Sequence, residues 1–330
     1  MLAIHLGDRL GWYRSLADDG PATAPELAAR TDTDARYARE WLEQQAVTGL
    51  LALEPGEDAA GNRYRLPAGA AEVLTDAESL AHLAPLPRML AAAAAQAPAL
   101  LEAYRHGGGV SWAQLGPDAR ESQADMNRPW FARLPEALAT VPALAALLAR
   151  DGARVADVGC GAGHAAVALA LAHPGLRVDG IDVDAPSLEL ARAHAAEAGV
   201  DDRVAVDLEG GAALAARGPH DLALALECVH DMPDPVPVLA AMLAAMGERG
   251  EVVVMDEAVA AALEAPGDDP ERLVHGFSLL VCLPDSCSGS RRCRSRASAR
   301  SAAPACCGDR DARPLRPLPA RRGASQGRAP

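Results

Sequence analysis

Val155-Ala-Asp-Val-Gly-Cys-Gly-Ala-Gly163 decides the fold of this chain of 330 residues. An apolar run ends in Asp157, the glycines Gly159, Gly161 and Gly163 follow, and an alanine-rich helical pattern comes next. Glycines are needed at such a turn because the backbone must bend sharply and approach a ligand without a Cβ in the way. The stretch predicts a strand, a tight turn and a helix whose N-terminus faces a nucleoside-containing ligand.

A second strand with a carboxylate at its end follows this helical pattern. Residues 176–182 read Leu-Arg-Val-Asp-Gly-Ile-Asp, so Asp182 ends the run. Strand ends in open α/β sheets face the ligand crevice, where Asp182 can accept hydrogen bonds from both hydroxyls of a ribose. In a dinucleotide fingerprint the third glycine stands five residues after the first, and that position here is His164. The spacing therefore disfavours a dinucleotide.

Short apolar runs alternate with helical patterns through residues 151–285. Strands are expected at 155–158, 178–181, 204–206, 222–226 and 251–255, and helices at 165–172, 186–197 and 236–246. This alternation indicates a parallel sheet that helices cover on both faces.

The G-x-G-x-G turn with Asp157 two residues ahead of it resembles motif I of class I S-adenosylmethionine (SAM)-dependent methyltransferases. Asp182 resembles the ribose-binding acid of their motif II. The resemblance implies an α/β fold with a Rossmann-like sheet, and SAM as the cofactor. It also implies that the glycine loop faces the carboxypropyl part of SAM, and that Asp157 orients this loop or receives the SAM ammonium group.

In this family an acid after the third strand binds the adenine amine. The corresponding position here holds Gly210, so Glu209 or Asp207 is the expected substitute. Glu227, after the fourth expected strand, is a further candidate cofactor-binding residue.

His230 is the candidate catalytic residue, because it follows the same strand and the strand ends face the crevice. A histidine there can deprotonate an acceptor hydroxyl or amine near neutral pH. The alternative is that His230 only caps the turn and packs on adenine.

Residues 1–76 predict a winged helix. Helical periodicity covers residues 6–17, 24–30 and 35–46, and short strands at 50–53 and 63–66 flank a polar loop, as in a hairpin. A DNA-binding winged helix carries basic side chains on its third helix. Here the third helix holds two arginines, Arg36 and Arg39, and two acids, Glu40 and Glu43. Because the acids balance the arginines, DNA binding is disfavoured.

The likeness extends over residues 5–285 and is closest to a bacterial family that joins a winged helix to a class I methyltransferase domain, described as methyltransferases or transcriptional regulators. In small-molecule O-methyltransferases the winged helix serves dimerisation and substrate capping, which implies a homodimer. The matching landmarks are Leu6-Gly-Asp-Arg-Leu-Gly11, Asn127-Arg-Pro129, the glycine motif, His230-Asp-Met-Pro-Asp-Pro235, Met255-Asp-Glu257 and Gly276-Phe-Ser-Leu279.

Residues 77–150 read as a helical linker that residues 107–109 and 125–131 interrupt. Only 3% of the residues are aromatic, so the group formed by Trp112, Trp130 and Phe131 stands out. It either packs between domains or forms a wall of the substrate pocket.

Composition excludes several functions. The chain has no lysine, and P-loop ATPases, pyridoxal phosphate enzymes and Schiff-base aldolases each need one. Its net charge is −14, and most acids precede residue 286, so the main body is a poor partner for phosphate backbones.

A cytoplasmic location is expected. Asp8 and Arg9 interrupt what would be the apolar core of a signal peptide, and the longest apolar run, 89–101, is too short to span a bilayer. The body holds the dispersed cysteines Cys160, Cys228 and Cys282, and no C-x-x-C pair is present, so no metal site is expected.

From residue 286 to 330 the chain loses its hydrophobic pattern and becomes rich in Arg, Pro, Ser and Ala. Such a segment is expected to be disordered. Class I methyltransferases continue with a sixth and a seventh strand, which this sequence lacks. A frameshift in the coding sequence explains the change, and a natural basic tail is the alternative.

These observations predict a SAM-dependent methyltransferase that acts on oxygen or nitrogen of a small molecule. The rival is a winged-helix transcriptional regulator that senses SAM or has lost it, and an inactive truncated product is a third possibility.

Overall fold

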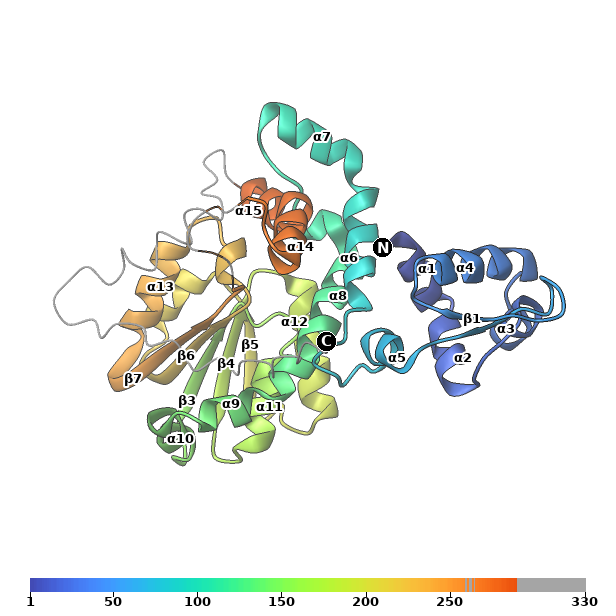
Figure 1. Ribbon diagram of the computed structural model, residues 1–330. Coiled ribbons are helices and arrows are strands. Elements are labelled where there is room, and N and C mark those ends of the chain that lie inside the picture. Colours follow the sequence, from blue (N-terminus) through green and yellow to red (C-terminus); the bar gives the residue numbers. More distant parts are fainter. Residues whose placement is uncertain (259, 261–262, 264, 290–330) are drawn as a thin grey trace.

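The computed structural model describes residues 1–258, 260, 263 and 265–289. A winged helix domain, a set of connecting helices and an α/β domain follow one another along the chain (Figure 1). Figure 1 shows the winged helix domain and the sheet on opposite sides of the helices α6 (Pro85–Ala95) and α8 (Trp112–Ala132).

The winged helix domain packs its helices and a two-stranded antiparallel hairpin around one core. Its elements are α1 (Leu2–Arg9), α2 (Trp12–Asp18), α3 (Ala24–Thr31), α4 (Ala35–Val47), β1 (Ala52–Glu54), β2 (Arg63–Arg65) and α5 (Ala68–Thr75). The single helix expected at residues 6–17 is wrong, because Gly11 has a φ of +70° and separates α1 from α2. Glycine adopts this left-handed conformation at little cost, which ends the helix there.

Aromatic side chains hold α1, α2 and α4 together. The ring centroid of Trp41 lies 4.8 Å from that of Trp12 and 4.9 Å from that of Tyr13. The indole Nε1–H of Trp41 donates a hydrogen bond to the carbonyl oxygen of Ala3 at 2.7 Å. A chain with few aromatic residues therefore concentrates three of them in the core of its N-terminal domain.

The connecting helices differ from the expectation in where they break. They are α6, α7 (Ala97–His106), α8, α9 (Leu134–Ala139) and α10 (Pro142–Leu148). Residues 125–131 lie inside α8 and do not interrupt it; the break in α8 falls at Gly116, which has a φ of +80°. Here again a left-handed glycine interrupts the helix, and Pro129 is accommodated within it.

The three linker aromatics do not form one cluster. Trp112 packs against the core that includes Val281, and Phe131 packs among α9, α10 and the sheet. Trp130 is 53% exposed. Because neighbouring residues of a helix point in different directions, Trp130 and Phe131 cannot share one pocket wall.

The α/β domain is a parallel sheet of order β5-β4-β3-β6-β7. Its strands are β3 (Arg154–Val158), β4 (Arg177–Asp182), β5 (Val204–Leu208), β6 (His220–Leu226) and β7 (Met246–Met255). The helices are α11 (His164–Ala172), α12 (Ala185–Glu197) and α13 (Pro235–Ala244), with the 3₁₀ turns η1 (Gly211–Ala216) and η2 (Val229–Asp231). The expected parallel sheet is confirmed, and its carboxyl ends lie along one edge.

Both faces of the sheet are covered because successive side chains of a strand point to opposite sides. Val155 joins a core with α11, α12 and the helices α9 and α10. Ala156 and Val158 join a second core with Leu214 of η1 and Met242 of α13. The near-continuous apolar strands of the sequence reflect this double burial.

Strand β7 is longer than expected. It begins at Met246, whereas the sequence predicted a helix through 246 and a strand from 251; its register against β6 shifts between His220 and Leu222. Among the described residues β7 pairs only with β6, so it is an edge of the sheet, and Val254 on it is 36% exposed. Such an edge can pair with other chains.

The last described segment folds back onto the connecting helices. It comprises α14 (Asp269–Phe277), the π-helical turn η3 (Ser278–Cys282) and α15 (Leu283–Ser288). The Val110 N–H donates to the Pro284 carbonyl at 3.0 Å, and the Trp112 N–H donates to the Asp285 carboxylate at 2.6 Å. The boundary expected between 285 and 286 thus falls inside a helix, whereas residues 290–330, expected to be disordered, lie outside the described residues.

A buried ion pair joins the connecting helices to the sheet. The Arg120 guanidinium on α8 donates to both carboxylate oxygens of Asp184, at 2.5 and 3.0 Å. Asp184 also caps α12 by accepting from the Ser187 N–H at 3.0 Å. This bidentate pair fixes the turn after β4 in position, and that turn follows directly on Asp182.

No single helix among the described residues is long and apolar enough to cross a membrane. The helical stretch Trp112–Ala139 and the helix Pro142–Leu148, bent by 105° relative to each other, reach that length and composition only together.

Candidate functional site

The turn after β3 is built from three glycines in the left-handed region. Gly159, Gly161 and Gly163 have φ values of +70°, +52° and +74°. The N–H groups of Gly159 and Cys160 both donate to the carbonyl oxygen of Ile181, at 2.8 and 3.2 Å. A side chain at any of the three positions would strain the backbone, so the residue type follows from the turn itself.

The three glycines differ in what surrounds them. A Cβ at Gly159 would lie 2.9 Å from the Cys228 side chain, and one at Gly163 would lie 2.8 Å from the Cβ of Ala191. A Cβ at Gly161 would meet nothing within 4 Å. The outer glycines therefore allow close packing, and the middle one leaves open space above the loop for a ligand.

Asp182 lies at the end of β4, beside this loop. One carboxylate oxygen accepts from the Gly161 N–H at 2.8 Å, and the other accepts from the Asp184 N–H at 2.9 Å. Burial raises the pKa of this carboxyl. Each oxygen keeps a lone pair beyond these bonds, so the pair can still accept hydrogen bonds from a diol.

Asp157 lies beneath the loop and is 2% exposed. Its Oδ2 atom is buried and has no hydrogen-bond partner among the described residues. Burial, and then the nearby charge of Asp182, raise its pKa to about 7. A buried carboxyl oxygen without a partner is costly, and a cationic ligand group or a bound water would satisfy it.

The acids expected to bind adenine are engaged with an arginine. Arg217 pairs with Asp207 at 2.8 Å and with Glu209 at 2.9 Å. The Glu209 N–H donates to the Asp182 carbonyl at 3.0 Å, so its backbone borders the site while its carboxylate faces Arg217. An adenine contact through either carboxylate remains a prediction.

Glu227 follows β6 in a conformation that is uncommon for a residue with a side chain. Its φ is +55°, and its N–H donates to the Met255 carbonyl at 2.8 Å. Burial, followed by the charge of Asp256, raises its pKa to about 7. Left-handed non-glycine residues concentrate at functional sites, and this position faces the same sheet edge as Asp182.

His230 lies in η2 between two carboxylates. Its Nδ1 bonds to Asp256, whose other oxygen accepts from the His230 N–H at 3.0 Å. Its Nε2 lies 3.3 Å from Asp231. Burial by itself lowers the pKa of His230, but the hydrogen bonds with Asp231, Asp256 and Cys282 outweigh it and hold this pKa well above its usual value. The imidazole is therefore protonated in this arrangement.

Sequence reasoning did not assign roles to Asp256, Asp231 or Cys282. Asp256 follows β7 directly, so the rule that strand ends face the crevice could have found it. Cys282 comes from the C-terminal segment, and no spacing in the sequence relates it to His230.

Comparisons with known proteins match both domains. Residues 156–252 match a family described as methyltransferase domain, and residues 1–76 match the Rv2258c-like winged HTH domain. The chain carries a methyltransferase domain. The matched part of this methyltransferase domain includes the glycine loop, Asp182 and His230, and the N-terminal match confirms the winged helix.

Curated relatives resemble one part of the chain. The ubiquinone biosynthesis O-methyltransferase of Bordetella parapertussis is 40% identical over 104 residues, which are 31% of this chain and 42% of that protein. The enzyme of the same name from Ralstonia nicotianae is 40% identical over 105 residues, again 31% and 42%. The chain thus spans less than half of the length of these relatives.

Solved structures match nearly the whole chain. An O-methyltransferase family protein from Burkholderia thailandensis has a TM-score of 0.66 at 16% identity, covering 92% of this chain and 87% of that one. Human N-acetylserotonin methyltransferase, solved with SAM, has a TM-score of 0.55 at 18% identity, covering 86% and 81%. The likeness confirms the expected fold, in which a winged helix is followed along the chain by a Rossmann-like methyltransferase sheet.

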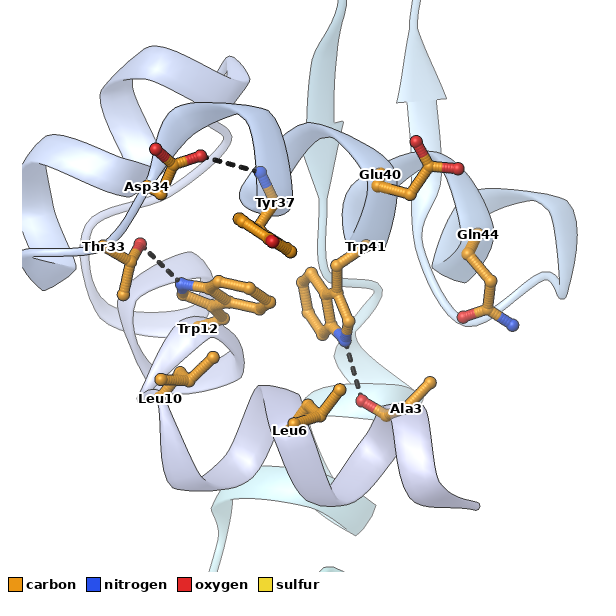
Figure 2. A pocket seen from close by; sticks show the side chains of 10 residues that line it. All are labelled: Ala3, Leu6, Leu10, Trp12, Thr33, Asp34, Tyr37, Glu40, Trp41 and Gln44. Carbon is orange, nitrogen blue, oxygen red and sulfur yellow. Dashed lines mark hydrogen bonds between the residues drawn. The ribbon is translucent and has the colours of Figure 1, made fainter.

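An apolar groove of about 540 Å³ opens between α1 and α4 of the winged helix domain (Figure 2). Its residues are Ala3, Leu6, Leu10, Trp12, Thr33, Asp34, Tyr37, Glu40, Trp41 and Gln44. Tyr37 is 75% exposed and Leu6 53%. The two arginines of α4 pair with acids of the same helix, Arg36 with Glu40 and Arg39 with Glu43. Helix α4 thus combines an apolar groove with arginines whose charges are paired.

The raised pKa of Asp157 makes stability depend on pH. An unfolded aspartate releases its proton near pH 4, whereas folded Asp157 keeps it until about pH 7. Between these values the folded state binds more protons, so Asp157 makes the free energy of unfolding fall as pH rises. Asp157→Asn removes this contribution. Urea unfolding is expected to show that Asp157→Asn lowers the free energy of unfolding less at about pH 8 than at about pH 5. An equal decrease at both pH values would mean that folded Asp157 is ionised throughout.

Proposed function

We propose that this protein transfers a methyl group from SAM to an oxygen or nitrogen atom of a small molecule. One observation carries the proposal: an open glycine loop, the carboxylate of Asp182 and the hydrogen-bonded His230 lie along the same edge of one sheet. The acceptor remains open, because the likeness to the ubiquinone enzymes concerns one domain only.

The residues of the loop fit SAM. The N–H groups at the start of α11 are suited to the carboxylate of its methionine part, because a helix N-terminus favours anions. Asp182 would accept hydrogen bonds from the ribose hydroxyls. The orphaned Oδ2 of Asp157 would receive the ammonium group, directly or through water, and Gly161 leaves room for the ligand above the loop.

SAM supplies an activated methyl group on its sulfonium, so the protein's task is to align the acceptor and to take up its proton. His230 is the proposed base, and Asp256 holds its ring through Nδ1. In this arrangement Asp231 lies against Nε2. His230 becomes a base when the acceptor replaces Asp231 at this nitrogen and the imidazole loses its proton.

The rival function is a regulator that binds duplex DNA through its winged helix. Such a protein needs unpaired basic side chains on the helix that enters the major groove. Arg36 and Arg39 on α4 form ion pairs along the helix, and Tyr37, Trp41 and Gln44 of the same helix line the apolar groove. These features support a protein partner over a nucleic acid, and we propose a homodimer that forms through this groove.

The groove suits a second copy because two of the residues that line it, Leu6 and Tyr37, are apolar and exposed. In a two-fold dimer each copy contributes the same patch, so Leu6 and Tyr37 of one copy can enter the groove of the other. Both side chains are more than half exposed in the single chain.

The SAM site is tested by titration calorimetry. Asp182→Ala is expected to weaken SAM binding by about 10- to 100-fold, because the ribose loses a charge-assisted acceptor worth about 1.5–3 kcal/mol. Glu189→Ala, on the exposed side of α12, is the matched control and should bind normally. Tighter binding of NADH than of SAM would overturn the assignment.

The role of His230 is tested with an acceptor found by screening phenols and amines. His230→Ala and Asp256→Asn should bind SAM with unchanged affinity and lose methyl transfer, His230→Ala by about 10²- to 10⁴-fold. If transfer persists at the wild-type rate in His230→Ala, this histidine serves only to cap its turn.

The dimer is tested by light scattering at micromolar concentration. The wild type and Leu53→Asp, which alters an exposed apolar side chain outside the groove, should have the mass of a dimer. The double variant Leu6→Asp/Tyr37→Asp should be monomeric, because two charges would be buried without partners. A wild type that is already monomeric would contradict the proposal.

A further inference from the structure

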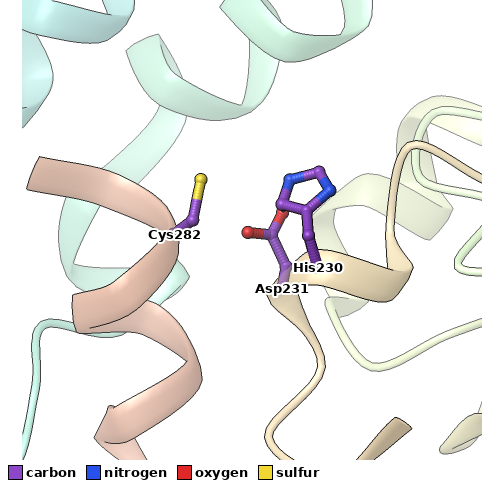
Figure 3. A group of neighbouring side chains, drawn as sticks. All are labelled: His230, Asp231 and Cys282. Carbon is purple, nitrogen blue, oxygen red and sulfur yellow. The ribbon is translucent and has the colours of Figure 1, made fainter. Parts of the chain in front are cut away.

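The C-terminal segment brings a thiol to the candidate base. His230 and Asp231 lie in η2 after strand β6, and Cys282 ends the turn η3. One ligand atom from each of the three residues lies within 4.8 Å of the others. Figure 3 shows the sulfur of Cys282 opposite the imidazole of His230 and the carboxylate of Asp231.

We infer that His230, Asp231 and Cys282 form a binding site for a divalent transition-metal ion of the zinc type. Nitrogen, oxygen and sulfur donors together are the set that zinc prefers. With metal–ligand bonds of about 2.0–2.3 Å, the ligand atoms of a tetrahedral site lie about 3.4 Å apart. The Nε2 atom of His230 already lies 3.3 Å from Asp231.

A partner of the histidine supports this site. Zinc-binding histidines usually donate their other ring N–H to a carboxylate, which orients the ring toward the metal. Asp256 bonds to Nδ1 of His230 in this way, and it also accepts from the His230 backbone N–H at 3.0 Å. The ring is thus held with Nε2 toward Asp231 and Cys282.

The unpaired oxygen of Asp231 supports it independently. Its Oδ1 atom is buried and has no hydrogen-bond partner among the described residues. A metal ion that binds both carboxylate oxygens of Asp231 would satisfy Oδ1, whereas the contact of Oδ2 with Nε2 of His230 leaves Oδ1 without a partner.

A second group, Glu227, His230 and Asp256, also brings three ligand atoms together. A metal there would need Nδ1 of His230, which already bonds to Asp256. Its carboxylates are hard ligands that suit magnesium, whereas Cys282 makes the first group a site for a softer ion.

The metal competes with the proposed base. A metal ion on Nε2 occupies the lone pair that would take the acceptor's proton, so methyl transfer and metal binding exclude each other at His230. This consequence rests on the proposed function, but metal binding itself does not. Three protein ligands leave the fourth position of a tetrahedral ion open to water.

The test uses Co²⁺ as a spectroscopic probe for zinc. The full-length chain is used with its four cysteines after residue 285, Cys287, Cys293, Cys306 and Cys307, replaced by serine, so that they cannot bind metal. One equivalent of Co²⁺ should produce a thiolate-to-cobalt charge-transfer band and the visible bands of a tetrahedral ion, and Zn²⁺ should remove both.

Variants locate the ion. Cys282→Ser should abolish the charge-transfer band, and Asp256→Asn should weaken Co²⁺ binding by about 10- to 100-fold. Cys228→Ser is the matched control and should keep the band. The Cys228 thiol lies in the same loop as His230, but it donates a hydrogen bond to the Val158 carbonyl. Circular dichroism confirms that each variant is folded.

Absence of the band, or a band that survives in Cys282→Ser, would overturn the proposal. Mg²⁺ binding that is independent of Cys282 and lost in Glu227→Gln would overturn it in favour of the second group. SAM titration of the same sample separates the two proposals: SAM binding without a Co²⁺ band defeats the metal site alone, and the reverse result defeats the proposed cofactor alone.

Discussion

The carbonyl oxygen of Ile181 is the acceptor on which the site depends. It receives the N–H groups of both Gly159 and Cys160, so the glycine loop is tied to the end of β4. Asp182, the next residue, returns the contact through its carboxylate to the Gly161 N–H. The end of β4 and the glycine loop that follows β3 are thus joined by a closed set of hydrogen bonds. These bonds hold the loop in its left-handed conformation before any ligand binds.

This arrangement gathers carboxylates at one edge of the sheet. The pKa values of Asp157, Asp182 and Glu227 are all raised, in each case mainly by burial. A nearby positive charge stabilises the ionised form of such buried carboxyl groups. SAM carries an ammonium group and a sulfonium, so the electrostatics of the edge favour the proposed cofactor over a polyphosphate ligand, in agreement with the absence of lysine.

The C-terminal segment has a second consequence for this edge. Helices α14 and α15 pack against the connecting helices near the carboxyl ends of the strands (Figure 1). This packing leaves β7 without a second neighbour among the described residues, and it carries Cys282 to His230. The histidine therefore lies among Asp231, Asp256 and Cys282, and its Nε2 is the atom for which the proposed acceptor and the proposed metal ion compete.

Local patterns in the sequence determined the sheet, the glycine loop and the position of Asp182, because strand periodicity and left-handed turns depend on neighbouring residues. The helix breaks at Gly11 and Gly116 were not predicted, because the φ of a glycine within a helical pattern cannot be read from the sequence. Only the tertiary structure decided that Arg217 forms an ion pair with Glu209 and that Trp130 is exposed whereas Phe131 is buried. It also decided that Asp256 and Cys282 lie next to His230. The contacts of His230 with Asp256 and Cys282 join segments far apart in the chain, and packing alone brings such segments together.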